Sequence, residues 1–332
     1  MALRLEEGLK LGIQTIHRQG DFETGPWLPR IDDLVAFVED VDAKGFDEIW
    51  LGDHVSFAIP FLDPLLMIAQ AAVASRRLVF GTGVYLLPLR HPGPVAKMTT
   101  TLDHLTEGRF IFGVGVGGEF PKEYEVCGVP RQERGRRLTE GIEAVRALWS
   151  GRPASYCGRH FSFEEVPMLP PPRQPGGPPI WCGGRRPPAL RRAGRLANGY
   201  VSYVVTPEMF QRALEEIGQA AEEAGRGEAP FGTGHLLFAR IDDSYERALD
   251  VATESLSRRY AMDFRKAAAR YAALGTGEQV AERIVEFHRA GARHVVVDLV
   301  GPYDRRPEQI ERFAGEVMPL LADLRVRPGL PR

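Results

Sequence analysis

Residues 78–118 read LVFGTGVYLLPLRHPGPVAKMTTTLDHLTEGRFIFGVGVGG, and this stretch decides the fold. Its two apolar segments, Leu78–Val84 and Arg109–Val116, are patterned as buried strands and are separated by a helical segment. Both strands end in glycine-rich loops, so the stretch is one β/α unit. Glycine lets the backbone approach a ligand closely, and such loops at neighbouring strand ends indicate a cofactor floor. The alternative is that these glycines serve tight turns alone.

Strand and helix patterns alternate along the whole chain. Strands are expected at residues 11–15, 47–51, 78–84, 109–116, 179–182, 199–204, 233–241 and 294–299, with helices between them. An insertion at about 151–177 combines a hairpin with a proline-rich loop, and a helical region breaks near 261–270. The pattern predicts an α/β fold, a (β/α)8 TIM barrel, with the insertion after the fourth helix and the broken region between strands seven and eight. We expect one domain over residues 1–332.

The composition argues against a nucleic-acid-binding, membrane or disulfide-rich protein. The chain has 332 residues and a net charge of −2, so no basic field indicates nucleic-acid binding. The N-terminal stretch MALRLEEGLKLGIQT resembles neither a signal peptide nor a membrane helix, which leads us to expect a cytoplasmic protein without a membrane partner. Three widely spaced cysteines fit neither a disulfide framework nor a zinc site.

In a barrel of this kind, active residues follow the carboxyl ends of the strands. Asp53 and His54 follow the second expected strand, where a histidine beside a carboxylate can act as acid or base. The alternative is a structural histidine bonded to backbone. His91, between prolines, either faces the same cavity or is a locked loop residue. The histidines share no metal-ligand spacing, so no metal is expected.

The turn after the fifth expected strand reads CGGRR from Cys182 to Arg186. A strand that runs through glycines into a helix start offers N–H groups to a phosphate, and two arginines would add charge-assisted bonds. The alternative is a helix cap with solvated arginines. The cofactor-binding candidates are Thr82, Gly83, Val84, Gly117, Gly118, Gly183, Gly184, Arg185 and Arg186. The candidates for a substrate pocket, which could instead be packing under loops, are Phe57, Tyr85, His91, Glu119 and Phe120.

Several segments together resemble the bacterial luciferase-like flavin and deazaflavin oxidoreductases. They are FDEIWLGDHV, the stretch from Leu78 to Pro130, ERGRRLTEGIEAVRALWSG and PPIWCGGRRPPALRRAGRLANGYV, and the resemblance spans about residues 12–321. It implies a (β/α)8 barrel with FMN or coenzyme F-420 at its C-terminal face and an insertion covering the pocket. By the same resemblance, His54 is the active-site histidine, Asp53 is its acidic neighbour, and the Gly183–Arg185 turn binds phosphate. It further implies a cis peptide at Gly83–Val84.

Two departures from the family pattern concern the substrate. Deazaflavin sugar-phosphate dehydrogenases of the family carry a catalytic glutamate where this chain has Gly118, with Glu119 one step later. They also carry a tryptophan where this chain has Phe57 and Ala58. Activity on sugar phosphates is therefore not expected.

Three functions remain open at this stage. In the first, coenzyme F-420 exchanges a hydride with a small organic substrate while His54 moves the proton. In the second, reduced FMN from a partner reductase reacts with oxygen. The third is a non-catalytic flavin or deazaflavin carrier. Arg185 and Arg186 favour the first, because they suit its longer anionic tail. The apolar stretch from Leu65 to Ala74 needs burial on more than one side and predicts a homodimer.

Overall fold

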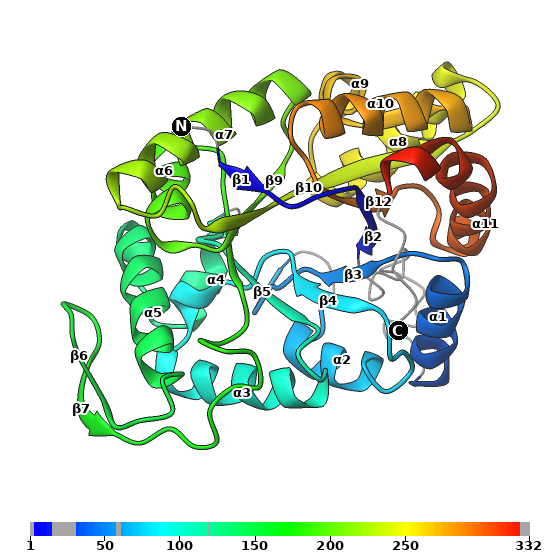
Figure 1. Ribbon diagram of the computed structural model, residues 1–332. Helices are drawn as coiled ribbons and strands as arrows, with labels where there is room; N and C mark the ends of the chain where they lie inside the picture. The colour runs from blue at the N-terminus through cyan, green and yellow to red at the C-terminus, as the bar shows by residue number, and fades with distance from the viewer. Residues whose placement is uncertain (1–2, 15–30, 58–60, 119, 326–332) are drawn as a thin grey trace.

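The computed structural model describes residues 3–14, 31–57, 61–118 and 120–325, and it shows a closed parallel barrel surrounded by helices (Figure 1). In ring order the barrel strands are β2 (Lys10–Gln14), β3 (Glu48–Leu51), β4 (Val79–Thr82), β5 (Phe110–Val114), β8 (Ile180–Gly183), β9 (Gly199–Tyr203), β10 (Pro230–Ile241) and β12 (His294–Leu299). Parallel pairing of β12 with β2 and of β9 with β10 closes the ring. The TIM barrel prediction is confirmed.

Helices pack against the outer face of the barrel and bury the outward-facing strand residues. They are α1 (Ile31–Ala43), α2 (Pro64–Ala71), α3 (Pro92–Leu105), α5 (Arg134–Leu148), α6 (Pro187–Leu196), α7 (Pro207–Glu223), α10 (Gly277–Arg289) and α11 (Arg306–Arg312). Local sequence fixes their starts. In α10, for example, Thr276 and Gln279 form a capping box, which satisfies backbone N–H groups that the first helical turn leaves free.

Both predicted interruptions are present. The insertion forms an antiparallel hairpin, β6 (Ala154–Cys157) and β7 (Ser162–Val166), which projects from the barrel at the lower left of Figure 1. The broken helical region consists of α8 (Tyr245–Tyr260) and α9 (Arg265–Tyr271). Ala261 separates them with a left-handed backbone, φ 51°. These two helices pack over the carboxyl end of β10 through an apolar cluster of their own.

Three short elements were not expected from the sequence. They are β1 (Arg4–Leu5), α4 (Pro121–Val126) and β11 (Ala273–Gly275). A strand of two or three residues, or a helix of six, is too short to show a hydrophobic period. The fourth expected strand also ends earlier than predicted, at Val114 rather than Val116, because the glycines that follow leave the ladder.

Two tryptophans fill the centre of the barrel. Trp50 from β3 and Trp181 from β8 have ring centroids 5.4 Å apart. Neighbouring strands make room for them with glycine: a Cβ at Gly81 or Gly232 would lie within 2.6 Å or 2.1 Å of an indole ring. The interior is therefore a packed core rather than a pore, as is usual for this fold.

A buried charged cluster lies below the tryptophans, at the amino ends of the strands. His294 Nδ1 lies 2.6 Å from Glu48 Oε1, and its Nε2 lies 3.0 Å from Glu6 Oε2. Trp50 donates its indole N–H to Glu48 at 2.7 Å. Burial alone would lower the pKa of His294, but the two carboxylates outweigh it and raise this pKa to about 9. This end of the barrel is thus closed by a paired imidazolium.

Candidate functional site

The carboxyl end of the barrel has two unlike halves. On four neighbouring strand ends the inward-facing position is a glycine, at Gly52, Gly83, Gly115 and Gly183. The other four inward positions carry side chains, which are those of Gln14, Tyr203, Phe238 and Asp298. Alternate residues of a strand point to the same side, so this division follows directly from the strand sequences. One half of the mouth therefore has no inward side chains at its strand ends, and four inward side chains wall the other half.

Val84 forms the floor of the glycine half. The Gly83–Val84 peptide is cis, as the family resemblance implied. A Cβ at Gly115 would lie 2.3 Å from Val84 Cγ2, and a Cβ at Gly183 would lie 2.8 Å from Val84 Cγ1. The valine side chain therefore occupies space that only glycine leaves free. Together with Trp50 and Leu236, Val84 makes this floor apolar.

His54 stands at the edge of this floor. It continues the inward-facing series of β3, which runs through Glu48, Trp50 and Gly52. Its Nδ1 lies 3.1 Å from both carboxylate oxygens of Glu123, a fully buried residue of α4.

Glu123 also accepts the backbone N–H of Val55 at 2.9 Å. The sequence analysis missed this glutamate, because α4 is short and its carboxylate reaches His54 across 69 positions of chain.

The contact with Glu123 sets the chemistry of the imidazole. A carboxylate that accepts from Nδ1–H fixes the tautomer and leaves the lone pair of the neutral ring on Nε2. Among the described residues, Nε2 has no hydrogen-bond partner, and the His54 side chain is 17% exposed. His54 can therefore take up a proton at Nε2 or return one.

Aromatic rings hold His54 in place and extend the wall beside it. Phe57 stacks on the imidazole with centroids 3.9 Å apart, and Phe61 meets its edge at 4.7 Å. Phe120, at the start of α4, packs on Phe57 at 5.7 Å. The structure thus brings two of the candidates for a substrate pocket, Phe57 and Phe120, beside the histidine. Glu119 lies outside the described residues.

Asp53 does not partner His54. Strand alternation turns it to the opposite side, where both of its oxygens pair with Arg90 and Oδ2 accepts the backbone N–H of Leu86 at 2.8 Å. Burial raises the pKa of the Asp53 carboxyl, and the Arg90 guanidinium opposes this shift. The expectation that Asp53 is the acidic neighbour of His54 does not match this geometry, because Asp53 ties the strand end to the loop that follows the cis peptide.

Three further candidates do not face the mouth. Thr82 alternates with inward glycines, and its buried hydroxyl donates to the Gly113 carbonyl at 2.7 Å. The Tyr85 ring is 1% exposed and lies under the Arg90 guanidinium, 4.3 Å from it. His91 caps α3 by accepting the Gly93 N–H at 3.2 Å. These three residues are predicted to line the site because they follow a strand end in the sequence. The direction of each side chain, which the sequence position does not give, turns them away from the mouth.

The loop after β5 shapes the backbone around the site. Gly117 and Gly118 have positive φ values of 58° and 108°, which favour glycine. The Gly118 carbonyl accepts from Arg131 Nη2 at 2.6 Å. A Cβ at Gly117 would lie 2.9 Å from the Leu86 side chain. Local packing accounts for both glycines, and this loop leads into α4 and therefore to Glu123.

The expected phosphate turn lies at the start of α6, next to the glycine half of the mouth. Gly184, Arg185 and Arg186 are exposed. The first two helical residues are prolines and provide no N–H, so the donors at this helix start are the loop amides and the two guanidinium groups. Arg185 donates to the Val204 carbonyl at 3.1 Å and lies along Tyr203. The exposed guanidinium groups of Arg185 and Arg186 therefore give this turn the positive charge that would attract an anionic group.

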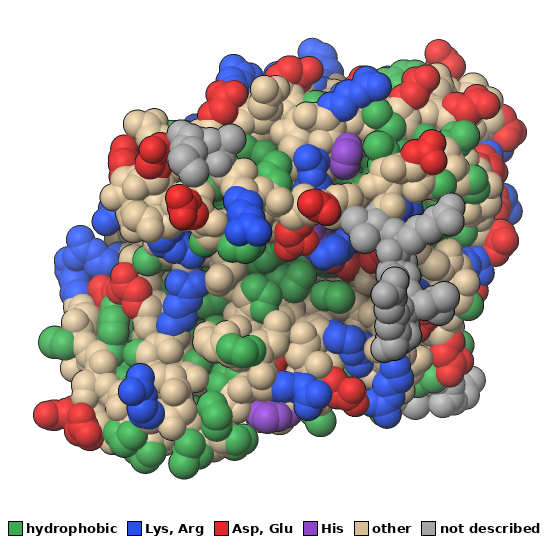
Figure 2. All heavy atoms as spheres, in the orientation of Figure 1, with side chains coloured by type: hydrophobic (Ala, Val, Ile, Leu, Met, Phe, Trp, Pro, Cys, Tyr) green, Lys and Arg blue, Asp and Glu red, His purple; other side chains and the backbone are tan. Residues whose placement is uncertain are grey.

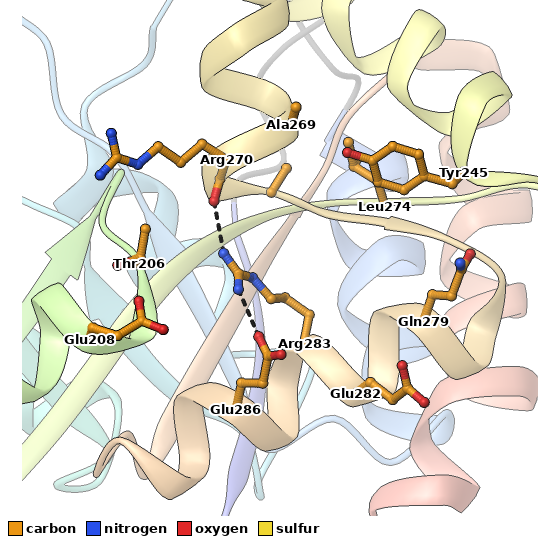
Figure 3. Close-up of a pocket in the computed structure, with 11 residues that line it drawn as sticks. Thr206, Glu208, Tyr245, Ala269, Arg270, Leu274, Gln279, Glu282, Arg283 and Glu286 are labelled. Atoms are coloured by element: carbon orange, nitrogen blue, oxygen red, sulfur yellow. Dashed lines mark hydrogen bonds and ion pairs between the residues drawn. The ribbon is translucent and has the colours of Figure 1, made fainter.

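A second hollow of about 440 Å³ lies between α7, α9 and α10 (Figure 3). It adjoins the end of β9, which stands opposite β3 in the ring. Its central cation, Arg283, is already held by Glu286 at 2.7 Å and by the Arg270 carbonyl at 2.8 Å. This hollow is therefore separate from the His54 site.

On the molecular surface, hydrophobic side chains gather in a hollow on one face, with charged side chains of both signs around it (Figure 2). Within the described residues, no cluster of three or more His, Cys, Asp or Glu has the arrangement of a metal site. No helix in the described part of the chain has the length and apolar character needed to cross a membrane.

Comparison with known proteins places this geometry in a family. The family model described as luciferase-like monooxygenase matches residues 9–294. An uncharacterized protein of Mycobacterium tuberculosis is 36% identical over 167 residues, which make up 50% of this chain and 57% of that protein. The stretch matched in this relative is thus little more than half of its length.

Two named enzymes are also similar. The 4-hydroxyprotoasukamycin monooxygenase of Streptomyces nodosus is 32% identical over 69% of this chain and 61% of its own. An F-420-dependent glucose-6-phosphate dehydrogenase of Microbacterium testaceum is 28% identical over 87% of this chain and 93% of its own. Among solved structures, a monooxygenase from Streptomyces bottropensis superposes with a TM-score of 0.81 at 24% identity, over 94% of this chain and 99% of its own.

Proposed function

The chain belongs to the luciferase-like monooxygenase family, a family of oxidoreductases, and we propose that it transfers a hydride between coenzyme F-420 and a small organic substrate. One observation carries the proposal: Glu123 holds Nδ1 of His54, so that Nε2 is the nitrogen available at the edge of a bare, apolar floor. We further propose that residues 1–332 act as a single domain.

The residues at the mouth fit such a cofactor. Four glycine positions and the Val84 floor would admit a flat ring, because these strand ends carry no inward side chain of their own; the Phe61 ring lies over Gly52 at the edge of this half. Arg185 and Arg186 would bind the anionic tail as charge partners. The bound coenzyme supplies the hydride acceptor or donor. Thr82 and Asp53, whose polar atoms are satisfied elsewhere, have no part in binding it.

His54 moves the proton that accompanies the hydride. When an alcohol substrate is oxidised, the bound coenzyme would supply the acceptor for the hydride of the C–H bond that breaks, and Nε2 of His54 would take the hydroxyl proton. In the reverse direction, His54 would return this proton to the carbonyl oxygen. Glu123 is a positioning residue, because it stabilises the protonated ring and fixes its orientation without touching the substrate. Phe57 and Phe120 keep water from this edge.

A second candidate is an FMN-dependent monooxygenase that receives reduced FMN from a separate reductase. The family model and the Streptomyces nodosus relative favour it. The same floor and the same arginines would hold FMN through its single phosphate. From the sequence we also propose that the protein forms a homodimer and is located in the cytoplasm.

Titration of the apo protein with coenzyme F-420 and with FMN, each oxidised and reduced, tests the choice by fluorescence quenching. Tight binding of F-420 with weak binding of FMN is expected. Selective binding of reduced FMN would replace the first candidate with the second. Binding of neither would overturn both.

A further inference from the structure

At the walled half of the mouth, one arginine pairs with a buried carboxylate and a second arginine lies nearby. Arg259 Nη1, from α8, lies 2.7 Å from Oδ2 of Asp298, the inward-facing residue near the end of β12. Arg306, the first residue of α11, donates from Nη2 to the Gln14 carbonyl at 2.5 Å and lies within electrostatic range of Asp298 and Arg259. Among these three described side chains, two positive charges face one negative charge.

Within the part of the chain that the structure describes, Arg306 is short of hydrogen-bond acceptors. Its buried Nε has no partner among these residues, and its guanidinium packs over the Phe37 ring, 5.4 Å from the centroid. Burial lowers the pKa of Arg306, which reflects the cost of holding this cation away from water. An oxyanion beside Arg306 would offset this cost with charge-assisted hydrogen bonds.

The cluster is close to His54 in the ring. The strands β12, β2 and β3 are consecutive neighbours, and they carry Asp298, Gln14 and His54 at their carboxyl ends. The Gln14 amide nitrogen lies 4.0 Å from the place of a Cβ on Gly52, two residues before His54. A small molecule that touches the cluster therefore reaches toward the histidine.

Aromatic side chains line the same half of the mouth. The Arg259 guanidinium lies 5.8 Å from the Phe238 ring centroid. Phe238 packs against Tyr203 at 6.1 Å and against Tyr260 at 6.4 Å. Phe238 is only 5% exposed beneath α8 and α9, whereas Tyr203 and Tyr260 are partly exposed. An apolar or aromatic body would rest on the two tyrosine rings, which Phe238 supports, while its charged end contacts the arginines.

We propose that the substrate of this site carries an oxyanion, a carboxylate or a phosphate monoester, which Arg259 and Arg306 bind beside the aromatic wall of Phe238, Tyr203 and Tyr260. The proposal names the substrate class of the oxidoreductase and so rests on the proposed function. The charged end lies at β12, three strands along the ring from β8, whose loop carries Arg185 and Arg186 and is left for the cofactor.

Calorimetric titration of the full chain with benzoate, phenyl phosphate and the neutral isostere benzamide tests the proposal without needing the natural substrate. Benzoate or phenyl phosphate is expected to bind at least about tenfold more tightly than benzamide, and Arg306→Gln and Arg259→Gln should each weaken that binding by about tenfold or more. The matched controls, Arg305→Gln and Arg258→Gln, remove exposed arginines one position earlier and should leave it unchanged. Circular dichroism checks that each variant folds, and Arg306→Lys, which keeps the charge, should retain part of the affinity.

Equal binding of benzamide and the anions, or equal loss in the control variants, would overturn the assignment. The F-420 titration on the same variants separates this result from the proposed function. Normal F-420 affinity without anion binding rejects the substrate class alone. If Arg306→Gln weakens F-420 and not the anions, the arginines hold the cofactor tail and the proposal fails.

Discussion

Nδ1 of His54 lies 3.1 Å from each carboxylate oxygen of Glu123, so a residue of β3's end and a residue of α4 form one unit. Changing Glu123→Gln should release the preference for the Nδ1–H tautomer, because an amide can donate as well as accept. We expect the ¹⁵N NMR signals of His54 to shift toward a mixture of tautomers, and turnover to fall by about tenfold to a hundredfold. Glu125→Gln, on the same helix but exposed, is the control. Unchanged His54 signals would show that Glu123 does not position the ring.

The close approach of Val84 to Gly183 can be tested with a mutant cycle. The added methyl of Gly183→Ala would meet Val84 Cγ1 at 2.8 Å, so we expect a loss of about 1–3 kcal/mol in the free energy of unfolding and weaker cofactor binding. Val84→Ala in the same chain should recover much of the loss. The control is Gly227→Ala, where the nearest atom lies 3.8 Å away. Additive effects of the two changes, measured by urea unfolding, would contradict the contact.

The Asp53–Arg90 pair should matter far more to stability than a surface pair. Arg90→Gln leaves the fully buried Asp53 carboxylate unpaired, which should cost about 3–5 kcal/mol of unfolding free energy. Arg76→Gln removes an exposed pair with Glu107 and should cost at most about 1 kcal/mol. Urea midpoints of the two variants and the wild type give the comparison. Equal losses would argue against a structural role for Asp53.

His294 should make stability depend on pH on the alkaline side. Its folded pKa of about 9 lies above the ordinary 6.5, so its contribution is full below about pH 6.5 and is lost as pH rises through 9. The destabilisation caused by His294→Gln should therefore be roughly 1–3 kcal/mol larger at pH 6 than at pH 10. Exposed His104→Gln is the control. A loss that does not vary with pH would mean that the imidazole is neutral in the fold.

The exposed apolar side chains of the α2 region give a test of the homodimer. Leu66 is 72% exposed and Val73 is 73% exposed, and they stand seven residues apart. If this face pairs with a second copy, Leu66→Glu should convert the dimer to a monomer in light scattering at micromolar concentration. Leu105→Glu, which changes an exposed leucine on α3, should leave the dimer intact. A monomeric wild type would reject the prediction directly.

Local sequence patterns predict the barrel and several residues of the candidate site. Alternating strands and helices gave the barrel, because each barrel strand must be buried on both faces and each helix on one. The same reasoning located His54, the Gly183–Arg186 turn and the insertion, since position after a strand end is a local property. The resemblance added the cis peptide at Gly83–Val84, which the structure confirms.

The sequence by itself determined the fold and the edge of the barrel at which the candidate site lies. Only the tertiary structure decided which side chains meet there. Asp53 and Glu123 are both carboxylates near the same strand ends, yet alternation turns the first toward Arg90 while α4 carries the second to His54. Arg259 of α8 pairs with Asp298 of β12, and Arg306 of α11 donates to the Gln14 carbonyl of β2. Such pairings join residues far apart in the chain, so their energies depend on packing that no local window of sequence contains.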